Sequence, residues 1–235
     1  EVLADDTQMN VLTTVLTVFA TYSKDAPINL ACAKLLLTLC LSENATSKML
    51  HLEVYNALIK SMATFGGSEE HVEAVLRALI AMVRGMEIPA TFVNMENLRI
   101  LYRTATDYSK DAFILTLMAN LLELLAPVSA SDLVTTGFVS ILLLGVRSSG
   151  DRACCHALAA LAISPECLYI LSQQCCSSDM LTLLKTYSKD AEVTAAALYL
   201  LRAMCKSSDA LRDMDNANFV LELWEVLKRF LEEER

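Results

Sequence analysis

The sequence has few of the residues that interrupt helices or form tight turns. Only 6 glycines and 4 prolines occur in 235 residues, which argues against a many-stranded sheet protein with frequent turns. Aromatic residues make up only 6%, whereas apolar residues of all kinds reach 54% and are mostly Leu, Ala, Val and Met. Leu- and Ala-rich segments without breakers favour helices. The composition therefore predicts an all-α fold with a large buried core.

Runs of Lys and Arg are absent, and the net charge at pH 7 is −9. A nucleic-acid-binding surface needs a basic stripe, so we expect no nucleic-acid partner. No membrane span is expected either, because a span needs about 20 apolar residues. The apolar stretch 112–130 contains Glu123 and Pro127, and the stretch 138–146 is too short. The sequence has no signal-peptide pattern, and because it does not begin with Met we expect a fragment of a longer protein.

The eight cysteines do not follow a metal-ligand pattern, because no Cys-x-x-Cys pair occurs. Most lie inside apolar helical patterns, and a chain of this length needs no disulfide framework. We therefore expect buried free thiols in a reducing, cytoplasmic compartment. Cys154, Cys155 and His156 form one conspicuous cluster, but neighbouring helix positions point about 100° apart and cannot converge on one metal. For Cys175 and Cys176, which lie near a loop, a redox-sensitive thiol is an alternative to core packing.

The sequence contains no recognisable catalytic constellation. Its only histidines are His51, His71 and His156, and it has no phosphate-binding loop, dinucleotide-binding fingerprint or paired-carboxylate pattern. We therefore expect no enzymatic activity, no cofactor and no metal site.

An internal repeat organises the chain. The pentapeptide Tyr-Ser-Lys-Asp-Ala occurs at 22–26, 108–112 and 187–191, at separations of 86 and 79 residues. Each separation is about twice the ~40–47 residues of one class of helical repeat. Weaker copies lie midway, at 66–70 and 148–151. The Ser or Asp of each copy can accept hydrogen bonds from the first amides of a helix, and Asp also complements the helix dipole.

Between these boundaries each repeat consists of a first apolar helix, a breaker segment and a closing helix. First helices are expected at 26–41, 69–84, 111–126, 151–163 and 190–205. Closing helices are expected at 8–21, 52–64, 94–105, 137–147, 179–186 and 218–231. The predicted repeats are a partial one at 1–21 and five others at 22–65, 66–107, 108–149, 150–186 and 187–235.

Three segments resemble the armadillo-repeat family. Residues 183–193, which contain the third pentapeptide, are similar to its closing-helix-to-turn signature, 195–204 to its second helix, and 137–143 to the glycine-plus-apolar entry to its third helix. The resemblance implies one domain over 1–235, a right-handed α-solenoid of about five armadillo-type repeats plus a partial N-terminal unit. HEAT repeats are the alternative. Stacked repeats of this kind form a concave groove, which the closing helices line in armadillo proteins.

Each closing helix carries a basic residue near its end and a polar or charged residue about one turn earlier. The candidate partner-binding residues are Asn56, Lys60, Arg99, Arg103, Ser140, Arg147, Thr182, Lys185 and Lys228. One cation per repeat would form a ladder with a spacing of about 10 Å, which suits an extended, acidic segment of a protein or peptide partner. The alternative is that these cations only complement the negative ends of helix dipoles.

These features predict a non-enzymatic interaction scaffold. Cytoskeletal, ciliary or trafficking machinery is the cellular setting that this hypothesis names. Armadillo-type nuclear-import adaptors hold basic peptides with repeated Trp and Asn, but this sequence has one tryptophan, Trp224, and Asn only sporadically. A basic cargo is therefore disfavoured. Two alternatives are a regulatory repeat domain, autoinhibitory or sensing, of a larger enzyme or signalling protein, and architectural packing in a filament. The sequence predicts no particular oligomeric state.

Overall fold

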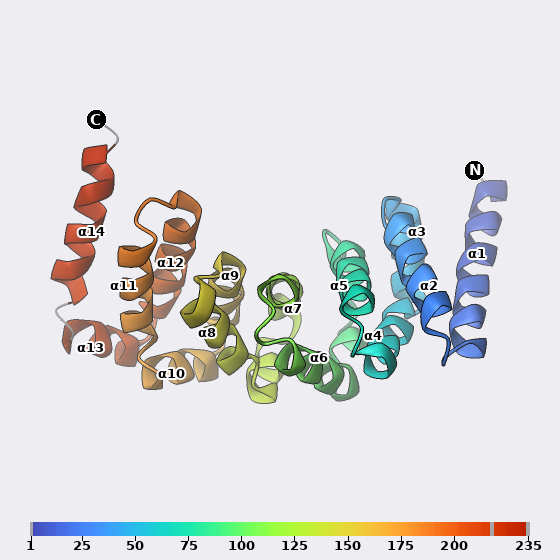
Figure 1. Ribbon diagram of the computed structural model, residues 1–235, viewed down its shortest axis with the longest axis horizontal. Coiled ribbons are helices and arrows are strands. Elements are labelled where there is room, and N and C mark those ends of the chain that lie inside the picture. Colours follow the sequence, from blue (N-terminus) through green and yellow to red (C-terminus); the bar gives the residue numbers. More distant parts are fainter. Residues whose placement is uncertain (1, 217–218, 234–235) are drawn as a thin grey trace. The chain divides into compact units, whose positions relative to one another are not determined.

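The computed structural model describes residues 2–216 and 219–233, and this part of the chain is helical (Figure 1). It contains fourteen α-helices and one short 3-10 helix, and no strand occurs among these residues. The prediction of an all-α fold is confirmed. The chain forms two compact units, Glu1–Tyr108 and Ser109–Arg235.

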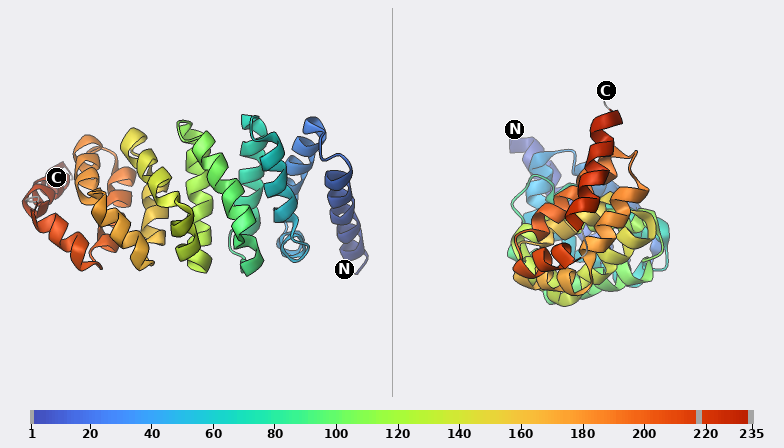
Figure 2. Two further views of the ribbon diagram at one scale, coloured as in Figure 1. Left: turned by 90° about the horizontal axis from the view of Figure 1, so that it is seen from below. Right: turned by 90° about the vertical axis from the view of Figure 1, so that its left-hand side faces the viewer.

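The first unit is built on contacts between helices of successive repeats. Its elements are α1 (Val2–Thr21), α2 (Ala26–Leu39), α3 (Glu43–His51), α4 (Val54–Phe65), α5 (Glu69–Val83), η1 (Ala90–Val93) and α6 (Met95–Asp107). Helix α2 packs on α5, while α4 packs on both α5 and α6 (Figure 2). Leu36, Leu58, Leu76 and Leu98 are fully buried, so the apolar faces of these helices form the core of the first unit.

The second unit follows the same scheme. Its elements are α7 (Ala112–Thr136), α8 (Phe138–Ser149), α9 (Arg152–Leu161), α10 (Pro165–Gln173), α11 (Cys176–Thr186), α12 (Ala191–Met204), α13 (Ser208–Asn216) and α14 (Phe219–Glu233). Helix α9 packs on both α7 and α12, and α11 packs on α8, α12 and α14. Met118, Leu142, Leu158, Leu184 and Leu200 are fully buried.

The aspartate of each pentapeptide begins a helix. Asp25 accepts a 3.0 Å hydrogen bond from the amide of Ile28, and Asp111 accepts an equal bond from the amide of Ile114. Asp190 caps α12 by accepting from two amides. In all three copies the cap is therefore the Asp, which satisfies free amides of the first turn.

The midway segments also begin helices, as their composition predicted. The side chain of Ser68 accepts a hydrogen bond from the amide of His71 at the start of α5. Asp151 accepts 2.7 and 3.2 Å bonds from the amides of Ala153 and Cys154 at the start of α9. A helix lies at each expected first and closing position among the described residues.

The expected breaker segments contain helices of their own, which the sequence reading missed. Helices α3, α10 and α13 lie between the first and closing helices of their repeats. Ser42, Ser164 and Ser207 accept hydrogen bonds from amides three residues later. These serines therefore cap the next helix, and a third helix lies between the first and closing helices in these three segments.

Helix α7 covers the first helix that was expected at 111–126 and continues into a second helical segment that ends at Thr136. It contains Pro127, and Ser129 has non-helical dihedral angles (φ −155°, ψ 53°). Among the described residues α7 is the one helix long and apolar enough to cross a membrane, with a mean hydropathy of 1.8 over its most apolar window. A buried core helix passes the same test, and α7 packs along α9 with Met118, Leu122 and Leu125 buried.

Candidate functional site

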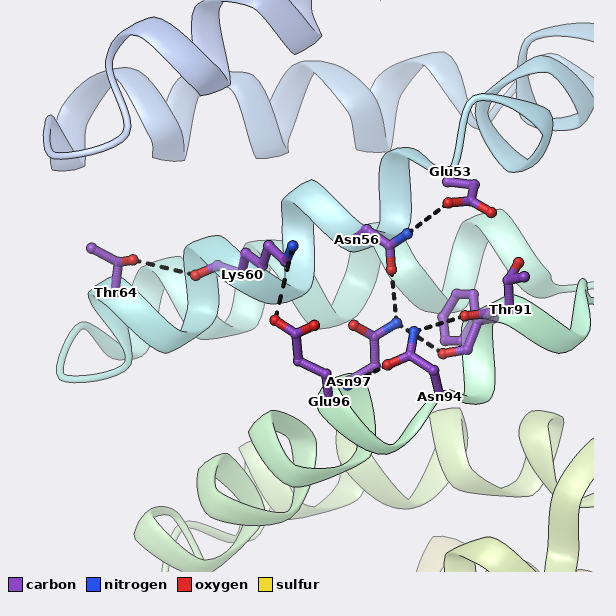
Figure 3. Close-up of polar contacts among 9 residues, drawn as sticks. Glu53, Asn56, Lys60, Thr64, Thr91, Asn94, Glu96 and Asn97 are labelled. Atoms are coloured by element: carbon purple, nitrogen blue, oxygen red, sulfur yellow. Dashed lines mark hydrogen bonds and ion pairs between the residues drawn. The ribbon is translucent and has the colours of Figure 1, made fainter.

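Helix α4 positions Asn56 and Lys60 one turn apart, and both contact α6 (Figure 3). The amide nitrogen of Asn56 donates to Glu53 (3.0 Å), and its amide oxygen accepts from Asn97 (2.9 Å). The Lys60 Nζ atom lies 3.9 Å from a carboxylate oxygen of Glu96. These two predicted binding residues therefore join α4 to the following closing helix.

A buried polar network continues from Asn97. Its side chain is 1% exposed and also donates to the carbonyl oxygen of Phe92. The hydroxyl groups of Tyr55 and Thr91 lie 2.6 Å apart, and the rings of Tyr55 and Phe92 contact each other in a tilted arrangement with their centroids 4.6 Å apart. Burial raises the pKa of Tyr55. Because buried polar groups need partners, the bonds of Asn97 to Asn56 and to the Phe92 carbonyl oxygen favour this placement of α6 beside α4.

Arg99 and Arg103 lie one turn apart on α6 and line a cleft of about 690 Å³ beside the end of α4. Both side chains are exposed. Arg103 Nε lies 3.8 Å from a carboxylate oxygen of Asp107. Arg99 has no hydrogen bond or ion pair with the residues that the structure describes. Of the nine predicted residues, Arg99 and Arg103 line this cleft, and Arg147 and Thr182 line a second cleft of about 320 Å³.

In the second unit Arg147 and Lys185 each form an ion pair with a carboxylate on the closing helix that follows their own. Arg147 donates through Nε to Asp179 (2.8 Å) and through a terminal nitrogen to the carbonyl oxygen of Gln174 (2.9 Å). The hydrogen bond to Asp179 raises the pKa of Arg147. Lys185 Nζ lies 2.5 Å from a carboxylate oxygen of Glu222 on α14.

The remaining three candidates, Thr182, Ser140 and Lys228, form no hydrogen bond or ion pair with one another in the part of the chain that the structure describes. Thr182 donates its hydroxyl to the carbonyl oxygen of Ser178 within α11. The side chains of Ser140 on α8 and Lys228 on α14 are exposed, and neither has a hydrogen bond or ion pair within residues 2–216 and 219–233.

A cation of one repeat pairing with a carboxylate of the next is a recurrent contact that the sequence reading missed. On closing helices the pairs are Lys60 with Glu96, Arg147 with Asp179, and Lys185 with Glu222. On first helices they are Lys34 with Glu70 and Arg152 with Glu192. Opposite charges one repeat apart in the sequence are the signal that could have revealed them. Exposed pairs of this kind stabilise by only about 0–1 kcal/mol each, but they neutralise three cations of the predicted ladder.

Ser61 and His71 form the one buried serine–histidine contact within the described residues. The Ser61 hydroxyl donates to the carbonyl oxygen of Leu58 (2.7 Å), so the 3.0 Å contact with His71 Nε2 has the imidazole as donor. A nucleophilic serine needs a base that accepts its proton, and this polarity is the reverse. His71 Nδ1 is buried without a hydrogen-bond partner, and burial lowers the pKa of His71.

The cysteines are free thiols, and most are buried. Burial raises the pKa of Cys155 and of Cys167 to about 12, which disfavours the thiolate form that binds metals or reacts. His156 lies against the ring of Tyr199 at 5.6 Å. No group of three or more potential metal ligands gathers within the part of the chain that the structure describes.

The sequence matches no protein-family model, and no curated protein and no solved structure matches it.

Proposed function

We propose that this chain is a non-enzymatic scaffold of the armadillo-repeat type, which binds an extended acidic segment of a protein partner along its closing helices. The observation that supports this most is the recurrence of the same contact one repeat apart. Tyr108 donates its hydroxyl to the carbonyl oxygen of Gly66, and Tyr187 donates to that of Ser149. Equivalent residues thus join equivalent helices, as stacking of similar modules requires.

The three-helix repeats favour the armadillo type over the HEAT type. Armadillo repeats have three helices and HEAT repeats two within a similar length, and α2, α3 and α4 form such a set of three. The proposed architecture is a right-handed α-solenoid of about five repeats plus a partial N-terminal one. The eight free cysteines support a reducing, cytoplasmic location for it.

The closing helices offer both positive charge and open polar side chains for such a segment. Arg99, Arg103 and Lys228 are exposed cations, and Ser140 adds an exposed hydroxyl. Lys60, Arg147 and Lys185 already pair with carboxylates of neighbouring repeats. In this proposal they align the closing helices, while the exposed residues contact the partner.

The test uses a partner identified by affinity purification and mass spectrometry and then purified. Binding of that partner is measured by calorimetry for the double variant S140E/K228E, which places negative charge on two closing helices. We expect its affinity to fall about tenfold or more, as charged contacts of 1.5–3 kcal/mol imply.

The matched control is K189E, at an exposed lysine in the turn before α12. This variant has one charge reversed away from the closing helices, and its affinity should equal that of the original chain. Equal affinities for S140E/K228E, K189E and the original chain would contradict binding along the closing helices.

A further inference from the structure

The cleft beside the end of α4 lies between α4 and α6, the closing helices of successive repeats. Met62 and Gly66 contribute one wall, and Arg99, Arg103 and Tyr108 contribute the other. The hydrogen bond from the Tyr108 hydroxyl to the Gly66 carbonyl oxygen closes one edge. The cleft therefore belongs to the stacked arrangement itself and needs no movement of a loop to form.

The cleft contains an excess of positive charge that the described part of the chain does not neutralise. Arg99 and Arg103 lie at positions i and i+4 of α6, where like charges repel. Arg103 makes a long 3.8 Å pair with Asp107, and its side chain is 81% exposed. Arg99 has no partner among the described residues. Two arginines with one carboxylate leave a local positive charge in a chain whose net charge is −9.

A second cleft in the other unit provides an internal comparison. It lies beside the end of α8, is lined by Val146, Gly150 and Tyr187, and has a volume of about 320 Å³. When the two clefts are aligned on Tyr108 and Tyr187, the position of Arg103 is taken by Thr182 and that of Arg99 by Ser178.

Among the described residues that line the second cleft, Arg147 is the one basic residue, and it is bound by Asp179 at 2.7 Å. The same architecture is therefore neutralised in one unit and left cationic in the other, so stacking alone does not account for the paired arginines.

The paired arginines match a phosphoryl group better than a carboxylate. One guanidinium fork binds both oxygens of a carboxylate, whereas a phosphoryl group carries about −1.5 to −2 charges and three acceptor oxygens. The guanidinium groups of Arg99 and Arg103 lie one helical turn apart, so both can donate hydrogen bonds to the same phosphoryl group. We propose that the Arg99–Arg103 cleft binds a phosphorylated side chain within an extended peptide segment. This inference rests on the proposed scaffold function and specifies one of its contacts.

The experiment titrates the full chain, labelled with ¹⁵N-arginine, with a glycine–alanine peptide that carries one central phosphoserine. We expect the side-chain Nε–Hε signals of Arg99 and Arg103 to shift and saturate while that of Arg147 stays in place. In calorimetry the variant R99Q/R103Q should bind the phosphopeptide about tenfold or more weakly, because it loses the charge-assisted hydrogen bonds of both guanidinium groups. R147Q, which alters the neutralised cleft, is the matched control and should bind normally.

Two further arms identify the ligand chemistry. The same peptide with glutamate in place of phosphoserine should bind at least about tenfold more weakly, because it occupies one fork only. Inorganic phosphate should also bind more weakly than the phosphopeptide. The variant R99K/R103K keeps both charges but removes the forks, and it should lose most of the phosphopeptide affinity.

Absence of a saturable shift at Arg99 and Arg103 would overturn the proposal, as would equal binding of the glutamate peptide or equal loss in R147Q. Inorganic phosphate binding as tightly as the phosphopeptide would overturn the peptide part. If these tests fail while S140E/K228E still weakens the partner complex, the phosphoryl site is wrong and the scaffold function stands. If both fail, the scaffold function is contradicted as well.

Discussion

The hydroxyl of Tyr108 donates a 2.9 Å hydrogen bond to the backbone carbonyl oxygen of Gly66 at the end of α4. Tyr187 makes the equivalent 3.1 Å bond to Ser149 at the end of α8. The last carbonyl groups of a helix have no partner within it, so each tyrosine satisfies one of them on the preceding closing helix. In these two copies of the pentapeptide, the tyrosine ends one closing helix and bonds to the end of the closing helix before it, while the aspartate caps the next helix.

Removing either hydroxyl should destabilise the protein. We expect Y108F and Y187F each to lower the free energy of unfolding by about 0.5–1.5 kcal/mol, the net contribution of one such hydrogen bond. Tyr22 occupies the same place in the first pentapeptide, but its side chain is 49% exposed. Y22F is thus the matched control. Urea unfolding measures all three, and an equal loss in Y22F would show that the bond to the preceding closing helix is not the cause.

Gly150 should tolerate no side chain. Its φ of +64° is in the left-handed region, and an added Cβ would lie 2.6 and 2.8 Å from ring atoms of Tyr187. G150A should cost about 1–2 kcal/mol for the backbone conformation and about 1–3 kcal/mol for overpacking. In G67A, the control, the added Cβ meets no atom within 4 Å, and thermal unfolding should be nearly unchanged. An unaffected G150A would mean that Tyr187 does not pack on this turn.

The aspartate caps should contribute measurably to stability. D111A removes the bond to the amide of Ile114 and should lower the free energy of unfolding by about 1 kcal/mol, within the range of about 0.5–2. K110A changes the adjacent exposed residue of the same pentapeptide and should stay within about 0.5 kcal/mol of the original chain. Guanidinium unfolding of the two variants compares them directly. Similar losses in both would assign the pentapeptide a role other than capping.

The first and closing helices could be predicted because each has a long apolar pattern and a recurrent boundary. The short helices in between could not. Ser42 and Ser164 lie in the segments between apolar helices, and serine both disfavours a helix interior and favours a cap. Helix α3 is largely polar, so no apolar run marked it. Its stability comes from burial of residues such as Met49 against neighbouring helices.

The candidate site was predictable only as a set of cations. The sequence indicates that Arg147 lies near the end of a closing helix, but Asp179 approaches it only after two repeats have stacked. Likewise Arg99 and Arg103 share a face of α6 by their spacing, but the cleft they line depends on how α6 packs against α4. Contacts between repeats depend on helix rotation and distance, which one repeat's sequence does not specify.

Acid should destabilise the protein through His71. This side chain is 2% exposed, and its buried Nδ1 atom has no hydrogen-bond partner among the described residues. Burial lowers its pKa below the ordinary value of 6.5. The unfolded chain therefore binds a proton at pH values where the folded chain does not. It follows that the free energy of unfolding contributed by this group is fully present above pH 6.5 and falls as the pH drops below it.

Urea unfolding at several pH values between about 5 and 8, the range in which histidine titrates, tests this dependence. One proton changes the free energy of unfolding by at most about 1.4 kcal/mol per pH unit. H71Q removes the titrating group while keeping an amide that can reach Ser61, so the loss of stability below pH 6.5 should become smaller. H51Q, at an exposed histidine, should keep the original slope. If H71Q and H51Q give the same slope of unfolding free energy against pH, a group other than His71 causes the acid sensitivity. His71 is the candidate because, among the described residues, it alone combines burial with a ring nitrogen that has no hydrogen-bond partner.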